Sequence, residues 1–462
     1  MQFPRIINPR FIAFSGSILF ILWLWLASDA PSSIKNHLSN ANWPTFGSSD
    51  SKADVFDFAP IHSEAVRAAC ERTEWNSSLV FTCDNNHGGV GHVRNSILNC
   101  VRYAIGAGGA LVLPNIALRE VDEDRDHEHD HQSAHGHSHG LGRRHGPGRK
   151  GMDYMFDAAH FKESLKMSCP ELKLINHLEP SANSRRRGLR PESLFSTPPT
   201  TGIEHPEEWQ VKLYTWIDRW MAPSLSTPIV IDLEQSFLQY PTHSDGHEFA
   251  HQFGSILKFR PDVRKLAAKA LRNMVQEYEL HVDAGEKMIE ASFLGVHLKT
   301  ENEMTTTEMK RHVVDAPYTH FEPQAHSYLS QASNANLQLL YAASGNISAI
   351  QDLDDLAISQ SKIVTSKYDL LTGKDRDELD ALKWDQKAMV DWLVLEKASD
   401  FAGLGQSAFS WNVALKRHEM ARRKGVLEEG HEGQRWKAWS DGLSTLYGVI
   451  EGYVESSGCM WP

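Results

Sequence analysis

The sequence predicts an α/β protein built on parallel sheets. A strand, a glycine loop, a helix and another strand follow one another in residues 79–114. A helix, a short strand and a glycine turn that opens a further helix occupy residues 391–409, and an additional strand is predicted at 293–301. Strands that alternate with helices pair in parallel, because the helix returns the chain to the same end of the sheet.

Composition limits the class of protein. The chain has 462 residues, of which 41% are hydrophobic, so it can bury a substantial core, and its length favours two or three domains. The formal net charge is -12. No stripe of Lys and Arg interleaved with aromatic residues offsets that charge, which argues against nucleic acid as a partner.

The N-terminal region predicts membrane anchoring. Residues 1–10 contain two arginines and precede an almost uninterrupted apolar run at 11–27. This asymmetry favours a single-pass type II signal anchor with a cytoplasmic tail at 1–10, although a cleaved signal peptide is the alternative. Residues 28–60, rich in Ser, Asn, Asp and Pro, are expected to form a stem. Either way the body would enter the secretory pathway, in the Golgi or endoplasmic reticulum, which the sequons at Asn76 and Asn346 fit.

The five cysteines suit an oxidising compartment. Cys70 and Cys83 are close enough in sequence to close a small loop, and Cys100 and Cys169 would then form a second bridge, leaving Cys459. The spacing of the cysteines does not determine which of them pair, and the alternative is that several of them are buried free thiols.

Residues 61–284 are predicted to form the N-terminal domain. Apolar periodicity and β-branched runs predict strands at 79–82, 110–114 and 229–233 and helices at 93–107 and 263–278.

Two loops interrupt this domain. Residues 121–150 are rich in His, Asp and Gly, and we expect a disordered, solvated insertion, with weak metal binding by clustered imidazoles as the alternative. A basic, proline-rich stretch at 181–206 is also predicted to be loop.

One segment matches the H-E-x-x-H pattern of zinc proteases, through His247, Glu248 and His251. The match is weak, because a charged residue and a glycine precede it and no further histidine follows at the usual spacing. The preferred interpretation is an ordinary helix capped by Ser244 or Asp245, with a zinc-dependent hydrolase as an unlikely alternative.

Residues 285–462 are predicted to form the C-terminal domain, with two polar sites. In the strand at 293–301, His297, Lys299 and Glu301 alternate onto one face near the carboxyl end, where open α/β sheets bind ligands. In the closing segment, Ser407 is the expected N-cap of a helix whose first turn can hold an anion.

These segments together resemble the GDP-fucose O-fucosyltransferase family. The loop HGGVGHVRNSILN followed by GGALVLPNI, the strand FLGVHLKTE and the segment WDQKAMVDWLVLEKASDFAGLGQSAFSWNVALKRH occur in the family's order, over roughly residues 87–418. The resemblance implies two Rossmann-like domains facing a cleft, the GT-B architecture, with residues 285–462 binding the nucleotide. It also implies metal-independent, inverting transfer of fucose, or a related sugar, from a GDP-sugar to a hydroxyl of a protein or glycan.

The resemblance also assigns roles to single residues. His297 and Lys299 match a catalytic His-x-Arg pair in which the cation steadies the diphosphate as it leaves. Asp391 matches the acid that accepts hydrogen bonds from guanine. The remaining donor-binding residues lie in the glycine loop and in the turn that holds the β-phosphate, and they are Gly88, Gly89, Gly91, His92, Ser407, Ala408 and Phe409.

Two positions depart from the family pattern. Lys299 stands where the family has arginine, and lysine offers a point charge in place of a planar two-pronged donor. His92 stands where the family loop carries asparagine. A catalytically weakened or inactive binding or scaffold protein of the secretory pathway is therefore the alternative function. His92 and Glu301 are the candidate bases for the acceptor hydroxyl.

Overall fold

The computed structural model describes residues 54–86, 88–118, 148–178, 186–195, 203, 205–220, 228–234, 240–300, 318, 320–425, 437–448 and 458–462. These residues belong to one unit, Asp54–Pro462. The predicted anchor at 11–27, residues 28–53 of the stem, the histidine-rich insertion up to residue 147, and Glu301 lie outside them. Among the described residues, no helix has both the length and the apolar character needed to span a bilayer.

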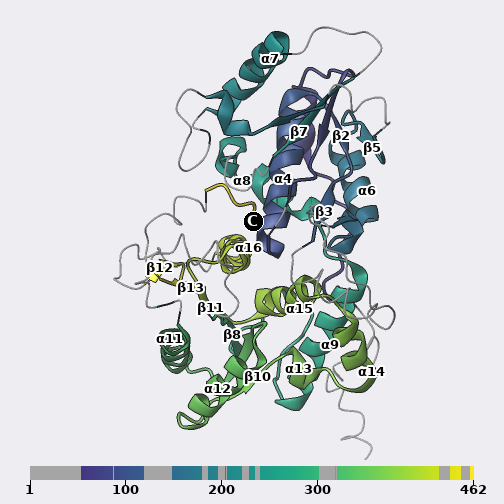
Figure 1. Ribbon diagram of the computed structural model, residues 1–462. Helices are drawn as coiled ribbons and strands as arrows, with labels where there is room; N and C mark the ends of the chain where they lie inside the picture. Colours follow the sequence, from purple (N-terminus) through teal and green to yellow (C-terminus); the bar gives the residue numbers. More distant parts are fainter. Residues whose placement is uncertain are drawn as a thin grey trace, which may run out of the picture. The chain divides into compact units, whose positions relative to one another are not determined.

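The first sheet is parallel throughout, as the alternation of strands and helices predicts (Figure 1). Its strand order is β5-β2-β1-β7-β6. The direction of strand addition changes at β1, which has β2 on one side and β7 on the other. The strands are β1 Leu79–Thr82, β2 Ala110–Val112, β5 Leu174–Ile175, β6 Arg186–Leu189 and β7 Ile229–Leu233.

Helices and a small hairpin surround this sheet. Burial of apolar side chains at helical spacing explains the two long helices: α4 is buried along most of its length, and α9 is buried along one face. The elements are α3 Glu64–Glu71, α4 Val90–Ala107, β3 Asn115–Ala117, β4 Arg149–Gly151, α6 Ala158–Ser168, α7 Trp209–Trp220, α8 His247–Phe253 and α9 Pro261–Glu277, with short 3-10 turns between them.

The second sheet has the order β10-β9-β8-β11-β13-β12, and only β12 runs antiparallel to its neighbour. Its strands are β8 Phe293–His297, β9 Leu339–Ala343, β10 Ile363–Thr365, β11 Asp400–Leu404, β12 Lys437–Ser440 and β13 Ser444–Tyr447. Its helices are α11 Phe321–Asn334, α12 Ile347–Ile358, α13 Lys367–Leu370, α14 Gly373–Ala381, α15 Trp384–Lys397 and α16 Ala408–Lys424. The α/β class with parallel sheets is thus confirmed.

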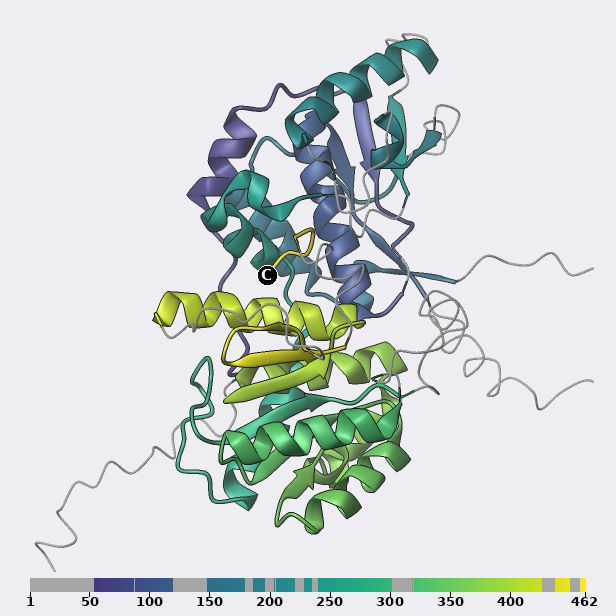
Figure 2. The same cartoon turned by 90° about the vertical axis from the view of Figure 1, so that its left-hand side faces the viewer.

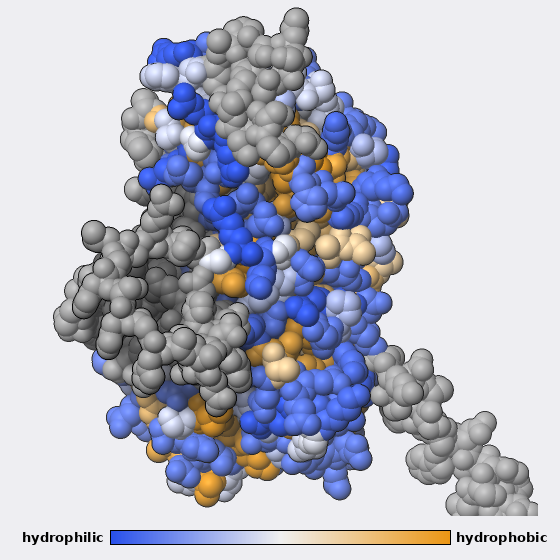
Figure 3. All heavy atoms as spheres, turned by 45° about the vertical axis from the view of Figure 1, so that its right-hand side comes forward, coloured by the Kyte–Doolittle hydropathy of each residue, from blue (hydrophilic) through white to orange (hydrophobic). Residues whose placement is uncertain are grey.

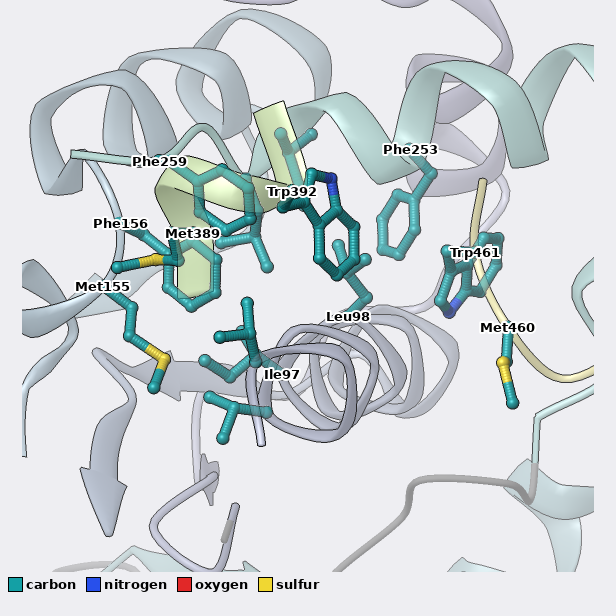
Figure 4. Close-up of a cluster of buried hydrophobic side chains, with 14 of the residues drawn as sticks. Ile97, Leu98, Met155, Phe156, Phe253, Phe259, Met389, Trp392, Met460 and Trp461 are labelled. Carbon is teal, nitrogen blue, oxygen red and sulfur yellow. The ribbon is translucent and has the colours of Figure 1, made fainter. Parts of the chain in front are cut away.

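One continuous apolar core joins elements from both halves of the sequence. Figure 4 shows Ile97 and Leu98 of α4 close to Trp392 of α15, and the rings of Phe259 and Trp392 meet edge to face at 5.4 Å. The exterior is mostly polar on the face that Figure 3 displays. Helices α4, α15 and α16 lie between the two sheets, as Figures 1 and 2 both show.

The predicted disulfide pairing is wrong. The bridges join Cys70 to Cys169 and Cys83 to Cys100, with Cα atoms 5.6 Å and 6.0 Å apart, while Cys459 stays outside both. Helix α4 packs against β1, which brings Cys100 to the end of that strand, and α6 packs beside α3. Proximity in the fold therefore overrides proximity in sequence.

Several boundaries also differ from the predictions. Residues 186–189, expected as loop, form strand β6, because β7 offers a free edge for pairing despite the polar sequence RRGL. Helix α4 begins at Val90, three residues earlier than predicted. The N-cap of α8 is Gly246, not Ser244 or Asp245.

Candidate functional site

The N-termini of two helices, one following a strand of each sheet, meet at the carboxyl edges of those sheets. Helix α4 follows β1, and α16 follows β11, so each first turn lies at the carboxyl end of a parallel strand. A Cβ atom on Gly91 would lie 2.7 Å from the carbonyl oxygen of Ala408, so only glycine permits this approach. The two predicted glycine motifs, more than 300 residues apart in sequence, are therefore in direct contact.

The loop that opens α4 presents backbone rather than side chains. Gly88 has φ +113°, a value that L-residues rarely adopt, and the N-cap Gly89 supplies no side-chain hydrogen bond to the helix. Half-buried His92 packs over Gly88, whose ideal Cβ would lie 3.1 Å from that of His92. First-turn amides of a helix have no intrahelical acceptors, so this loop is suited to an anion.

The turn that opens α16 is fixed by two serines. Ser407 is the N-cap, as predicted, and its side chain accepts a hydrogen bond from the amide of Ser410 at 3.4 Å. The hydroxyl of Ser410 accepts a bond from the amide of Leu404 at 3.1 Å, which ties the helix to the end of β11. The amides of Ala408 and Phe409 belong to the same first turn, so the N-terminus of α16 offers its donors and its positive dipole end beside the α4 loop.

His297 joins this turn from β8. Its Nδ1 atom lies 2.7 Å from the Ser410 hydroxyl, and its ring lies 4.5 Å from that of Phe409. Burial, helped by the positive charges of Lys299 and Lys367, lowers the pKa of His297 to about 3. The imidazole is therefore neutral at physiological pH, and it can donate one hydrogen bond and accept another.

Lys299 lies two residues beyond the end of β8 and is half-buried. Its backbone is held from both sides by Gln324, whose oxygen accepts from the Lys299 amide at 3.1 Å and whose nitrogen donates to the Lys299 carbonyl at 2.7 Å. The ammonium is close enough to His297 to lower the pKa of that imidazole. A cation is thus anchored at the edge where the two helix N-termini meet.

Asp391 has partners that the sequence did not indicate. Its carboxylate is 5% exposed and accepts hydrogen bonds from Lys367 at 2.5 Å and from the Tyr341 hydroxyl at 2.8 Å. A carboxylate offers about four acceptor positions, so two are occupied by these bonds. The next residue, Trp392, packs edge to face against Phe409 at 5.2 Å, which links this helix to the α16 turn.

The structure therefore brings together the glycine loop, the α16 turn and His297, with Lys299 on the loop that follows β8. Asp391 is buried in a separate polar cluster of the same half. The sequence analysis did not identify Ser410, although its position three residues after the N-cap Ser407 places it in the first turn of α16. It also missed Lys367, which follows the β-branched end of strand β10.

A family comparison identifies the chain. The family model for GDP-fucose protein O-fucosyltransferase matches residues 79–420, or 342 of the 462 residues. The chain belongs to this O-fucosyltransferase family.

The solved structures that resemble this O-fucosyltransferase family member share little sequence identity with it but cover most of its length. POFUT1 in complex with GDP is 12% identical with a TM-score of 0.42, and the match covers 81% of this chain and 100% of that chain. POFUT1 in complex with GDP-fucose, in a first crystal form, is 12% identical with a TM-score of 0.42, and the match covers 82% of this chain and 99% of that chain. A mutant of Arabidopsis thaliana FUT1 in complex with GDP is 12% identical with a TM-score of 0.38, and the match covers 77% of this chain and 73% of that chain. No curated protein matches the sequence.

The H-E-x-x-H segment of this family member makes protein contacts. His247 is exposed at the start of α8, whereas His251 Nδ1 lies 3.5 Å from Glu419 of α16, at ion-pair rather than close hydrogen-bond distance. Among the described residues, one group of three possible metal ligands has its ligand atoms within 4.8 Å, namely Cys70, Cys169 and Glu171. Its two cysteines form a disulfide, so that group is not a zinc site.

Glu419 should make the stability of this protein pH-dependent. Burial raises the pKa of Glu419, but neighbouring His251 and Arg422 outweigh burial and lower that pKa to about 2. A lowered folded-state pKa adds stability above the ordinary value of 4.5, and this contribution is lost as pH falls towards 2. The thermal midpoint of Glu419→Gln should fall below wild type near pH 6, and the gap should shrink between pH 4.5 and 2. A gap that is constant over this range would contradict the assignment, and exposed Glu163→Gln is the control.

Proposed function

We propose that this protein is a glycosyltransferase that transfers fucose from GDP-fucose to a hydroxyl of a protein or glycan, by an inverting, metal-independent reaction. The observation that carries the proposal is the contact of Gly91 with Ala408. It brings two helix N-termini together at the carboxyl edges of two parallel sheets, where a diphosphate has donors and favourable dipoles. Family membership supplies the sugar and the nucleotide.

In this proposal the β-phosphate binds to the first turn of α16. The amides of Ala408 and Phe409 and the hydroxyl of Ser407 donate to its oxygens, while the Gly88–Gly91 loop approaches the sugar nucleotide from the other side. The Lys299 ammonium and the two helix dipoles offset the negative charge of the diphosphate. His297, kept neutral, donates a hydrogen bond to an oxygen of the GDP-sugar without adding charge.

Asp391 is proposed to recognise guanine, in addition to its bonds with Tyr341 and Lys367. The N1–H and exocyclic amine of guanine form a paired donor edge that matches a carboxylate. The bonds from Tyr341 and Lys367 fix the orientation of that carboxylate before the nucleotide arrives. Uracil and adenine lack this donor pair, so the site would favour GDP.

The reaction exchanges one C1–O bond of the sugar for another and removes the proton of the acceptor hydroxyl. The acceptor oxygen attacks C1 of the sugar, and the bond between C1 and the β-phosphate oxygen breaks with its electron pair leaving on GDP. Lys299 stabilises the charge that grows on that leaving oxygen. The proton of the acceptor hydroxyl passes to a base on the side of the sugar away from GDP. His92, in the first turn of α4, is the candidate for this base.

We further propose that residues 61–284 and 285–462 act as the two Rossmann-like domains of a GT-B enzyme, with the nucleotide held by the second. Residues 11–27 would anchor the chain as a type II protein in the secretory pathway, with residues 28–60 as a stem. The two disulfides support an oxidising compartment for the body.

The proposal is tested by nucleotide-dependent thermal shift of the full-length protein. A ligand at 100 times its Kd stabilises the folded state by about 2.7 kcal/mol, which raises the thermal midpoint by a few degrees. GDP should raise the midpoint, whereas UDP and ADP at equal concentration should not. Equal shifts for all three, or no shift with millimolar GDP, would contradict a GDP-sugar site.

A further inference from the structure

The last five described residues, Gly458–Pro462, are docked inside the folded body and are called here the C-terminal clamp. Trp461 is fully buried, and its ring lies 4.6 Å from that of Phe253 and 5.7 Å from that of Tyr240. Figure 4 shows Trp461 beside Phe253, with Met460 next to it. Trp461 and Met460 are both buried, which removes a large apolar area from water and holds this segment in place.

Polar residues of α4 bind the backbone of the C-terminal clamp. The side chain of Asn95 accepts from the Trp461 amide at 2.8 Å and donates to the Cys459 carbonyl at 2.7 Å. Asn99 accepts from the Trp461 indole at 2.7 Å. Arg94 donates to the carbonyls of Trp461 and Pro462 at 2.6 and 2.9 Å. This helix is the one whose first turn forms the glycine loop.

Arg94 also reaches the other half of the site. It donates to the side-chain oxygen of Asn412 on α16 at 3.1 Å, and Asn412 in turn donates to the carbonyl of Ala408 at 2.7 Å. That carbonyl is the atom that approaches Gly91. A chain of hydrogen bonds therefore runs from the C-terminal clamp through Arg94 and Asn412 to the point where the two helix N-termini meet.

Arg94 depends on these hydrogen bonds, because its charged side chain is buried. Arg94 is 6% exposed, and burial lowers the pKa of its guanidinium to about 10, so it remains charged at neutral pH. It donates to oxygens of three segments: the side chain of Asn412, the carbonyl of Gly254 at 3.1 Å, and the carbonyls of the C-terminal clamp. A buried cation without acceptors is costly, so removal of the C-terminal clamp should shift Arg94 and, through Asn412, the start of α16.

We propose that Arg94 is a positioning residue for the nucleoside diphosphate site, and that the C-terminal clamp holds it in place. Arg94 does not touch the donor. It fixes the spacing of the α4 loop and the α16 turn, and this spacing sets how well both N-termini contact one diphosphate. This inference rests on the proposed function.

The test compares Arg94→Met, which keeps the stem of the side chain, with Asn412→Ala and Trp461→Ala in the full-length protein. Each should weaken GDP binding about tenfold or more by calorimetry, a loss of about 1.4 kcal/mol. Amides 88–93 and 408–412 should also exchange hydrogen faster, because both first turns loosen. In a double-mutant cycle, Arg94→Met and Trp461→Ala should be strongly non-additive for GDP binding, since they act through one chain of bonds.

Leu353→Ala is the matched control, because Leu353 lies on α12 and is fully buried in a second core cluster. It should lower the thermal midpoint and leave the Kd for GDP within twofold of wild type. The proposal is overturned if folded Arg94→Met and Asn412→Ala bind GDP as wild type does. If wild type itself binds no GDP, the proposed function fails, and unchanged exchange at 88–93 and 408–412 in these variants would then overturn the positioning role separately.

Discussion

Replacement of Asp391 by alanine is expected to destabilise the protein by about 3–5 kcal/mol, because it removes the carboxylate that pairs with the buried Lys367 ammonium. Lys367 is 2% exposed and donates to Asp391 at 2.5 Å, and Tyr341 loses its acceptor in the same variant. Chemical denaturation followed by circular dichroism measures the loss as a lower midpoint.

The control separates charge pairing from guanine recognition. The triple variant Asp391→Leu, Lys367→Met and Tyr341→Phe removes all three polar groups together, so it should recover most of the stability but none of the preference for GDP over UDP. Asp391→Asn should keep the shape and lose that preference as well. If Asp391→Ala unfolds at the wild-type midpoint, the buried pair is not a stabilising feature of the fold.

Replacement of Lys299 by alanine is expected to lower kcat for transfer about 10²–10³-fold, the size of effect seen when one preorganised group facing developing charge is removed. The thermal midpoint should change little, because the backbone bonds from Gln324 to residue 299 do not involve the side chain. Initial rates with GDP-fucose and single-turnover measurements check the chemical step directly.

Lys299→Arg tests whether the residue found here limits activity. Arginine restores a planar two-pronged donor, so a large gain would show a natural enzyme with weakened chemistry and would favour the binding or scaffold alternative. Robust turnover by the wild-type protein rejects that alternative. Lys166→Ala, on the exposed surface of α6, removes the same charge far from the proposed site and should leave the rate unchanged.

Much of the local structure follows from sequence pattern. Strand β7 occupies 229–233 as predicted, because a β-branched run is buried and has one favourable conformation. Ser407 caps α16 because a capping serine before a helical run acts through bonds within one turn. Strand β6 escaped prediction, since its residues pair only because β7 presents an edge.

The sequence alone determined the α/β class, the order of the glycine motifs and the family resemblance, because each depends on residues that are neighbours along the chain. Only the tertiary structure decided the disulfide pairs, the burial of Asp391 against Lys367, and the contact of Gly91 with Ala408. These depend on which helix packs over which strand, and that choice is made by burial of the common core. A local pattern carries no record of such distant partners.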